Sequence, residues 1–264
     1  MTRWFVKGIN MRSMTGFLTL VKREIVRFTC VFTQTIFPPV MSSFLYIFIF
    51  GYSLGQRIET VQGVPYLVFL VPGLIMMYVI EGAYANTSSS LFISRWANNI
   101  EELLVTPLSY LEMVMAILIG GLARSLVTVS GVYLVSLCFV RFPPAHWAWA
   151  LFFIVMVSLV FSSVGMITAL FAEEFEHLSL MTTFVITPLV FLGGVFHSIQ
   201  MVPEGLRWIT QLNPMFYMIN GLRYGMLGQS DAPLAQSAGV VTILFGVLFG
   251  ATVWLFKTGF KLRK

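Results

Sequence analysis

Charged residues are scarce in this sequence, and their scarcity restricts the class of protein. Asp, Glu, Lys and Arg make up 10% of the 264 residues, whereas an average soluble domain contains about 25%. Hydrophobic residues make up 58%, and the mean hydropathy is +0.86. A soluble domain of this length could bury a core, but such a surface would not stay dissolved in water. Several apolar runs also reach the length of a membrane span, so the composition indicates an integral membrane protein.

Cysteine and clustered metal ligands are nearly absent as well. Cys30 and Cys138 stand far apart in or near apolar segments, and we interpret them as unpaired small hydrophobic residues. The acidic segment 173–177 contains one His, but no second His or Cys lies nearby, which argues against a metal site. No nucleophile, base and acid can be placed in one arrangement. The sequence therefore predicts no metal site, no bound cofactor and no catalytic residue.

Two nucleotide-related signals are missing too. No G-x-x-x-x-G-K-[ST] phosphate loop occurs in the chain, so it has no evident means of holding ATP. The net charge of +5 comes from cations at the chain ends and between the hydrophobic runs, where membrane proteins carry their orientation signals. Because these cations form no basic patch interleaved with aromatic residues, nucleic acid is excluded as a partner.

Long apolar segments dominate what is present. Six spans are expected at 31–54, 65–93, 111–140, 147–172, 178–196 and 236–256. Prolines inside three of them are compatible with membrane helices, because neighbouring groups satisfy the freed carbonyls. With both termini on one side, that side carries 11 of the 16 Lys and Arg residues, the other carries 4, and Arg124 lies within a span. This excess predicts that both termini are cytoplasmic.

The segment before the first span is amphipathic and basic. Over 13–29, apolar residues fall on one helical stripe, while Lys22, Arg23 and Arg27 lie off it. Such a helix is suited to lie at the membrane surface. The alternative is a solvated helix that packs on a partner, and the two interpretations are compatible.

The cytoplasmic loop 95–106 has the most informative pattern. Asn98 and Glu101 fit a capping box, which predicts a short helix that stops before Pro107. Ser109 and Glu112 repeat the pattern at the start of the third span. A short helix across the ends of two spans could pass a push from a soluble partner to both. The alternative is a capped connector without a partner, and the capping pattern does not decide between them.

The external segment 195–228 is interrupted by Pro and Gly, yet it is too apolar for a free loop. We expect two short helices that dip into the outer leaflet, where non-helical backbone must be covered by protein or line a wet cavity. The alternative is an amphipathic surface cap with aromatic anchors.

Two charges lie inside the spans. Glu81 and Arg124 each sit 13 residues from the expected cytoplasmic end of their span, counted from Ser94 and Leu111, or about 20 Å deep at 1.5 Å per residue. Equal depth on consecutive antiparallel helices predicts an ion pair, because an unpaired charge there costs at least a few kcal/mol. A substrate contact is the alternative role.

Several motifs together resemble a known family. Residues 99–109, NIEELLVTPLS, are similar to the coupling-helix segment of ABC-2 type permeases, and residues 212–225, LNPMFYMINGLRYG, are similar to the family's segment before the last span. Pro188 and the GGVF run at 193–196 also fit. In order and spacing the motifs resemble the YadH-like branch of bacterial ABC-2 membrane subunits, from about residue 13 to the C-terminus.

The resemblance implies a fold and a division of labour. It implies one all-α membrane domain over 1–264, with six transmembrane helices, an N-terminal amphipathic interface helix at 13–29 and an external re-entrant helical hairpin at 195–228. The chain would form a homodimer among membrane lipids in the bacterial inner membrane and export a lipid-like, amphipathic or drug-like substrate. It would be no enzyme, because two copies of a separate ABC ATPase subunit would hold ATP and Mg. A secondary transporter driven by an ion gradient is the alternative, with Glu81 as its one clear acidic candidate.

The resemblance also assigns residues to two surfaces. The ATPase would dock on the coupling helix, 95–106, and its flank, at Asn98, Asn99, Ile100, Glu101, Glu102, Leu103, Leu104, Thr106 and Pro107. The external gate would include Phe196, Trp208, Asn213, Pro214, Tyr217, Arg223 and Tyr224.

Overall fold

The computed structural model describes residues 11–53, 60–61 and 63–262, with the backbone alone at 11–13, 52–53 and 104. Within these residues, six helical segments are long and apolar enough to cross a membrane. The predicted all-α fold with six spans is confirmed. Strand occurs in the described residues as one short antiparallel pair, β1 (Thr60–Val61) and β2 (Val64–Pro65), which pairs Thr60 with Pro65 and Val61 with Val64.

The six spans lie near the expected positions, with two departures. The first is broken into α2 (Phe32–Thr35) and α3 (Phe37–Ser53), and the fifth joins α8 (Phe175–Met181), the π-helical segment η1 (Thr182–Ile186) and α9 (Thr187–Leu192). The other four spans are α4 (Tyr66–Trp96), α6 (Tyr110–Leu137), α7 (Trp147–Phe171) and α12 (Leu234–Thr258). The remaining helices are α1 (Met11–Cys30), α5 (Ile100–Val105), η2 (Ile199–Met201), η3 (Glu204–Leu206), α10 (Arg207–Leu212) and α11 (Pro214–Leu227).

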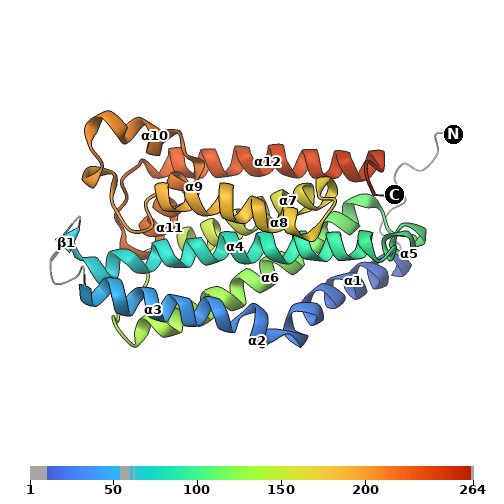
Figure 1. The fold of residues 1–264 in the computed structure, drawn as a ribbon, viewed down its shortest axis with the longest axis horizontal. Coiled ribbons are helices and arrows are strands. Elements are labelled where there is room, and N and C mark those ends of the chain that lie inside the picture. The colour runs from blue at the N-terminus through green and yellow to red at the C-terminus, as the bar shows by residue number, and fades with distance from the viewer. Residues whose placement is uncertain (1–10, 54–59, 62, 263–264) are drawn as a thin grey trace.

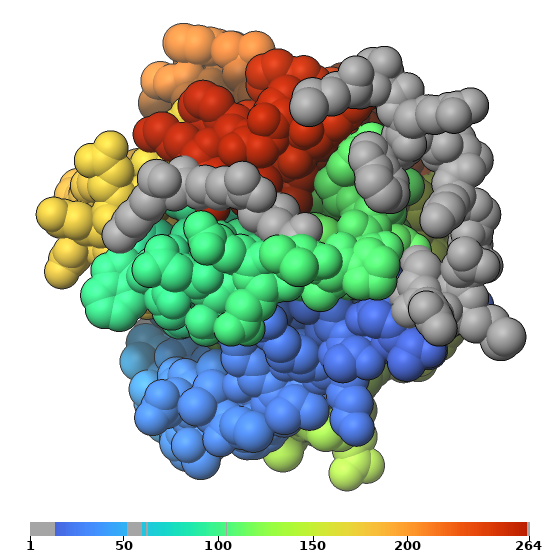
Figure 2. Space-filling model, turned by 90° about the vertical axis from the view of Figure 1, so that its right-hand side faces the viewer, coloured from blue at the N-terminus to red at the C-terminus, as the bar shows by residue number. Residues whose placement is uncertain are grey.

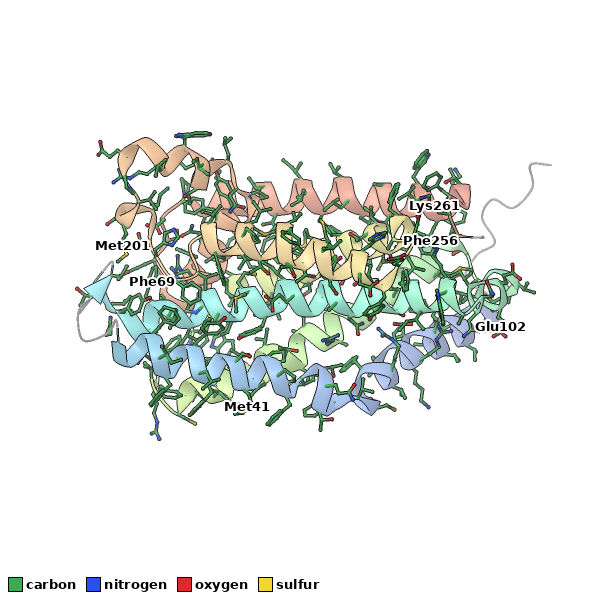
Figure 3. All side chains as sticks on the ribbon, viewed as in Figure 1. Met41, Phe69, Glu102, Met201, Phe256 and Lys261 are labelled. Carbon is green, nitrogen blue, oxygen red and sulfur yellow. The ribbon has the colours of Figure 1, made fainter. Side chains whose placement is uncertain are left out.

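The long helices run side by side along one axis (Figure 1), so the molecule has two ends. We call them the α5 end, where α1 begins and α12 finishes, and the α10 end, which also carries β1. Side chains mark the two ends as well: Glu102 and Lys261 lie at the α5 end, whereas Phe69 and Met201 lie at the α10 end (Figure 3). Seen from the α5 end, α5 and the neighbouring end of α4 lie between α12 and α1 (Figure 2).

The helix α4 is the centre of the packing. In its most apolar stretch 83% of the residues are buried, and it packs chiefly against α7 and α6. Small residues permit this close approach: a Cβ on Gly165 of α7 would come within 2.7 Å of the Tyr84 carbonyl oxygen of α4. Helices in membranes associate by van der Waals packing at such small residues, so α4, α6 and α7 form the core of the protomer.

The outer helices are covered on one side only. The apolar stretches of α3 and of α8–α9 are each 17% buried, and that of α12 is 22% buried. Large apolar side chains such as Phe44, Phe184 and Trp254 are exposed on them. Exposed apolar surface of this extent needs lipid or another protein chain against it.

Candidate coupling surface and buried polar sites

The helix expected over 95–106 forms as α5, and it is shorter than expected. Positions 95 and 96 belong to the last turn of α4. The capping box predicted at Asn98 is wrong: Asn98 has a φ of 60°, and Asn99 stands at the N-cap of α5 without a side-chain bond to it. Asn is among the few residues besides Gly that adopt the left-handed conformation routinely. The Asn therefore turns the chain out of α4 and does not start the next helix.

The second predicted capping box is present at the start of α6. The Ser109 hydroxyl accepts from the Glu112 backbone N–H at 3.3 Å, and the Ser109 N–H donates to the Glu112 carboxylate at 2.8 Å. Two otherwise unpaired donors of the first turn are thereby satisfied. The α6 end of the connection is fixed by these bonds.

The two faces of α5 differ in chemistry. Ile100 and Leu103 are 3% and 9% exposed and join an apolar cluster with side chains of α1, α4, α6 and α7. Glu101 and Glu102 are exposed, and Val105 is 85% exposed. The adjacent Thr106 and Pro107 are exposed as well, whereas the side chain of Leu104 lies outside the described residues. The inward face of α5 is apolar, and its outward face carries two carboxylates and an exposed valine. This arrangement suits a helix that packs on the bundle with one face and binds a partner with the other.

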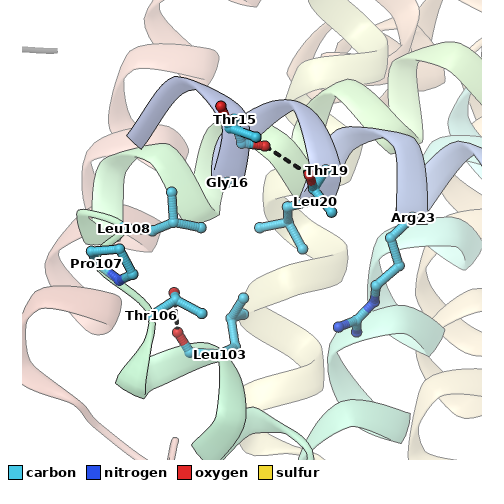
Figure 4. A pocket seen from close by; sticks show the side chains of 9 residues that line it. All are labelled: Thr15, Gly16, Thr19, Leu20, Arg23, Leu103, Thr106, Pro107 and Leu108. Atoms are coloured by element: carbon cyan, nitrogen blue, oxygen red, sulfur yellow. Dashed lines mark hydrogen bonds between the residues drawn. The ribbon is translucent and has the colours of Figure 1, made fainter. Parts of the chain in front are cut away.

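A groove of about 530 Å³ separates α5 from α1 (Figure 4). The α1 wall contributes Thr15, Gly16, Thr19, Leu20 and Arg23, and the other wall is formed by Leu103, Thr106, Pro107 and Leu108. The two walls meet where Leu108 lies against Gly16, at which an added Cβ would be 3.2 Å from the leucine side chain. The groove therefore ends in direct contact between α1 and the connection from α5 to α6.

A buried polar network, which the sequence interpretation missed, holds α1 against α4. Glu24 is 1% exposed, and its two oxygens accept from the Ser90 hydroxyl at 2.9 and 2.7 Å. Arg27 donates to the backbone and side-chain oxygens of Asn86 at 2.6 and 3.0 Å, and to the Ser89 hydroxyl at 3.2 Å. The guanidinium Nε lies 3.5 Å from Glu24. We call these five residues the α1 clasp.

The α1 clasp accounts for the burial pattern of α1, whose place at the membrane surface stays a prediction. Leu20 and Phe28 are buried, but Met14 and Leu18, which the apolar stripe also includes, are 51% and 58% exposed. The buried face contains Glu24 in their place, because the serines of α4 offer it hydrogen bonds. Burial lowers the pKa of Arg27, and Glu24 acts in the opposite direction. The signal in the sequence was a Glu and an Arg three residues apart, facing a run of small polar residues at 86–90.

The predicted ion pair between Glu81 and Arg124 does not form. In the part of the chain that the structure describes, the ion pairs within 4 Å join Glu24 to Arg27, Glu204 to Arg207 and Asp231 to Arg223. The expected equal depth is correct, because a Cβ on Gly82 would lie 3.9 Å from the Ser125 hydroxyl across the α4–α6 contact. Glu81 and Arg124 each precede a position of this contact by one residue, which is a rotation of about 100° around each helix, so neither side chain points straight into the contact.

Arg124 instead binds a carbonyl that proline leaves free. Its Nη2 donates to the Thr35 backbone oxygen at 3.3 Å. In a continuous helix that oxygen would accept from the N–H of residue 39, but residue 39 is a proline and has no N–H. The side chain of α6 thus satisfies the break between α2 and α3, as expected for kinked membrane helices.

At the α10 end, Arg223 of α11 is 1% exposed and has three partners. Its Nη2 donates to the Gly194 carbonyl at 2.8 Å, its guanidinium carbon lies 3.9 Å from the Phe69 ring centre, and Nη1 lies 3.9 Å from Asp231. Asp231 also accepts from the Ser198 hydroxyl at 2.7 Å. Burial lowers the pKa of Arg223 to about 10, with Asp231 opposing the shift, so the arginine remains charged at neutral pH. Asp231 was not among the predicted site residues.

The predicted gate residues divide into buried and exposed sets. Asn213 caps α11 by accepting from the Met215 N–H at 3.0 Å and donating to the Leu189 carbonyl at 2.6 Å, while Pro214 opens the helix. Phe196 packs among aromatic rings, including Phe50 at 4.8 Å. These residues and Arg223 fasten α11 and the 193–196 turn to the bundle.

Three other predicted gate residues lie further out. Trp208 on α10 is 58% exposed. The Tyr217 hydroxyl donates to the Gln211 carbonyl at 2.9 Å, and Tyr224 stacks on His146 at 5.0 Å. The segment 195–228 therefore has a buried helix, α11, and an exposed part that contains η2, η3 and α10.

The fold is that of a helical membrane protein in which a short helix bridges two spans at one end, and comparison with known proteins gives the family. The family model described as ABC-2 type transporter matches residues 15–227. The chain belongs to this family. It is 43% identical to the inner membrane transport permease YadH of Escherichia coli (strain K12), over 91% of this chain and 94% of that one.

Two more distant relatives share one name. Nodulation protein J of Rhizobium leguminosarum bv. viciae is 27% identical over 78% of this chain and 80% of its own length, and the protein of the same name from Rhizobium meliloti (strain 1021) is 26% identical over 70% and 71%. The chain is therefore the permease subunit of an ABC transporter, and its family implies an ATP-binding partner subunit.

Proposed function

We propose that this permease is an exporter subunit of the bacterial inner membrane, with both termini in the cytoplasm and α5 as its coupling helix. The observation that carries the proposal is the position of α5, which bridges the ends of α4 and α6 and turns Glu101, Glu102 and Val105 outward. ATP and Mg would bind to two copies of the ATPase subunit, which would dock on residues 95–106 and the adjoining Pro107.

A displacement of α5 can reach the membrane spans through two sets of contacts. Ile100 and Leu103 share an apolar cluster with α4 and α6, so a shift of α5 presses on both spans directly. The second route runs through Leu108 and Gly16 to α1, which the α1 clasp ties to α4. Close-packed contacts of this kind transmit displacement, because protein interiors have low compressibility.

A homodimer would cover the apolar surfaces that are exposed on one protomer. The exposed apolar faces of α3 and α8–α9 flank α4, and a second copy against them would enclose a route between the two protomers. The segment 195–228 would close this route on the external side as a re-entrant hairpin. The route has an apolar and aromatic lining, which suits a lipid-like, amphipathic or drug-like substrate.

The docking of the ATPase is tested with matched charge reversals on two exposed glutamates. The permease is purified with its ATPase, and ATP hydrolysis is measured in lipid. Glu102→Arg on α5 is expected to lower complex recovery and substrate-stimulated hydrolysis several-fold, because it reverses a charge on the docking face. Glu176→Arg, on the exposed start of α8, is the control and should change neither. Equal behaviour of the two variants contradicts the proposed docking site.

The ion-driven alternative rests on one observation, the carboxylate of Glu81 inside a span. It predicts substrate transport by the permease alone in liposomes with an ion gradient and no nucleotide. Transport only with the ATPase and ATP supports the exporter, and nucleotide-free transport refutes it.

A further inference from the structure

A groove of about 620 Å³ lies where the chain leaves α6 and turns toward α7. Its walls include Leu134 and Leu137 from the last turns of α6, and Arg141 stands among the apolar side chains that line it. The connection lies at the α10 end of the molecule next to α3 (Figure 1), where the rings of Phe139 and Phe44 are 5.3 Å apart. The described lining shares no residue with the groove beside α5 or with either buried arginine site, so the proposed transport function makes no use of it.

Contacts at both ends of the connection hold this groove in shape. The Tyr133 hydroxyl of α6 donates to the Phe142 carbonyl at 3.0 Å, and the two rings meet edge to face at 6.3 Å. These contacts fold the connection back onto α6. At its other end, the backbone N–H of His146 donates to the Gly225 carbonyl of α11 at 2.7 Å. The groove is therefore formed by the fold itself and is present before anything binds in it.

The groove extends across the end of a membrane span. Leu134 lies in the last turns of α6 and is 64% exposed, whereas Arg141 follows the end of that helix at Leu137. Trp147, the first residue of the next span, is 66% exposed. Tryptophan and tyrosine concentrate where the apolar core of a membrane meets the headgroups, so Trp147 and Tyr133 mark that level. The groove thus combines an apolar part inside the span with a cation beside the headgroups.

Arg141 is available to bind an anion. The residue is exposed, and the described ion pairs and hydrogen bonds do not engage its side chain. The sequence from Met113 to Ala172, which covers the connection and most of both flanking helices, contains no Asp or Glu. A guanidinium group binds phosphate through two parallel N–H donors. A molecule that matches this groove therefore has a phosphate at one end and an apolar chain at the other.

We propose that this groove binds an anionic phospholipid, with the lipid phosphate on Arg141 and one acyl chain along Leu134 and Leu137. The apolar walls accept a chain from any lipid, so the preference for an anionic lipid rests on the arginine. A zwitterionic lipid carries a cation close to its phosphate, and Arg141 repels that cation. With the proposed cytoplasmic termini, the bound lipid belongs to the outer leaflet. The inference goes beyond the proposed transport function, because the site needs neither the ATPase nor a substrate.

The test uses two lipids that differ only in their headgroups. Phosphatidylglycerol and phosphatidylcholine with the same diazirine-labelled acyl chain are added in trace amounts to phosphatidylcholine nanodiscs that contain the full-length permease. After illumination, mass spectrometry measures the labelling of residues 133–143. Phosphatidylglycerol is expected to label this segment several-fold more than phosphatidylcholine. Arg141→Gln should remove the difference, whereas Arg141→Lys should retain it. Arg207→Gln, which changes another arginine at the α10 end, is the control and should behave as the wild type.

A second measurement uses a thiol that lines the groove. Cys138 is exposed there, and Cys30 at the end of α1 is exposed elsewhere on the molecule. The rate at which N-ethylmaleimide modifies each cysteine is measured in nanodiscs with and without phosphatidylglycerol. The anionic lipid is expected to slow modification of Cys138 several-fold relative to Cys30, and Arg141→Gln should abolish this protection. Free glycerol phosphate should not protect Cys138, because it has no acyl chain to fill the groove.

Four results would overturn the proposal. Equal labelling by the two lipids would show that the apolar walls alone hold a lipid, and a preference that persists in Arg141→Gln would place the anion elsewhere. Protection of Cys138 by glycerol phosphate would indicate a phosphate site without a lipid. Slow modification of Cys138 in pure phosphatidylcholine, with no labelling by either lipid, would show that a second copy of the chain covers the groove. Because both measurements are made on the permease without its ATPase, their outcome is independent of the proposed exporter function.

Discussion

Two sites in different parts of the molecule each pair an arginine with a buried carboxylate, and they are built differently. In the α1 clasp, Glu24 and Arg27 lie one turn apart on the same helix, Arg27 is 29% exposed, and the bonds reach across to side chains and backbone of α4. At the α10 end, Arg223 and Asp231 are both 1% exposed and hold the backbone of the 194–199 turn. The first site joins two helices through hydrogen bonds to a partly exposed arginine. The second site holds a loop against the core through a fully buried pair.

Breaking the Arg223–Asp231 pair at the α10 end should lower the stability of the protein most. Arg223→Met leaves Asp231 buried without its cation, and loss of one partner of a buried pair costs about 3–5 kcal/mol. The free energy of unfolding, measured by detergent denaturation, is expected to fall by that amount. The double variant Arg223→Met with Asp231→Leu should lose less, because it leaves no buried charge. A double variant that is less stable than the single one would contradict this account.

Gly→Ala substitutions at the two ends should produce a smaller difference in stability. A Cβ at Gly225 would lie 2.4 Å from the backbone nitrogen of Ala150, whereas a Cβ at Gly16 would meet the far end of the Leu108 side chain at 3.2 Å. Overpacking costs about 1–3 kcal/mol, and a backbone cannot rotate aside as the end of a side chain can. Gly225→Ala should therefore lower the denaturation midpoint more than Gly16→Ala. Gly246→Ala, with nothing within 4 Å, is the control and should leave it unchanged.

Among these variants, loss of the Glu24 carboxylate from the α1 clasp should have the smallest effect on stability. It should have the largest effect on the coupling between substrate and ATP hydrolysis. Glu24→Gln keeps an acceptor for Ser90 and leaves Arg27 bonded to Asn86, so the expected stability loss is about 1 kcal/mol. If α1 and α4 move together, substrate stimulation of the ATPase should fall several-fold while basal hydrolysis stays the same. Glu204→Gln, which removes an exposed pair near α10, should alter neither quantity. Normal stimulation in Glu24→Gln would show that the clasp has no part in coupling.

Features that depend on a few neighbouring residues were predictable from the sequence. The six spans follow from apolar length, and the cap of α6 from Ser109 and Glu112, because each depends on local hydrogen bonding or hydropathy. The same local rule was wrong at Asn98, since Asn suits a left-handed helix end as well as a helix start.

The buried sites could not be predicted in the same way. The pairing of Glu24 with Ser90 and of Arg223 with Gly194 depends on which helices become neighbours and how each is rotated. Glu81 and Arg124 illustrate the limit: Gly82 and Ser125, the residues that follow them, face each other across the α4–α6 contact, but the two charges do not pair. Sequence position gives height along a helix more reliably than direction around it.

The break in the first span depends on a side chain from another part of the chain. Because Pro39 has no N–H to donate, the Thr35 oxygen relies on Arg124 of α6 as its described donor. The bend between α2 and α3 therefore depends on a side chain of α6: releasing this one charged hydrogen bond would cost about 1.5–3 kcal/mol and leave the Thr35 oxygen without its described donor.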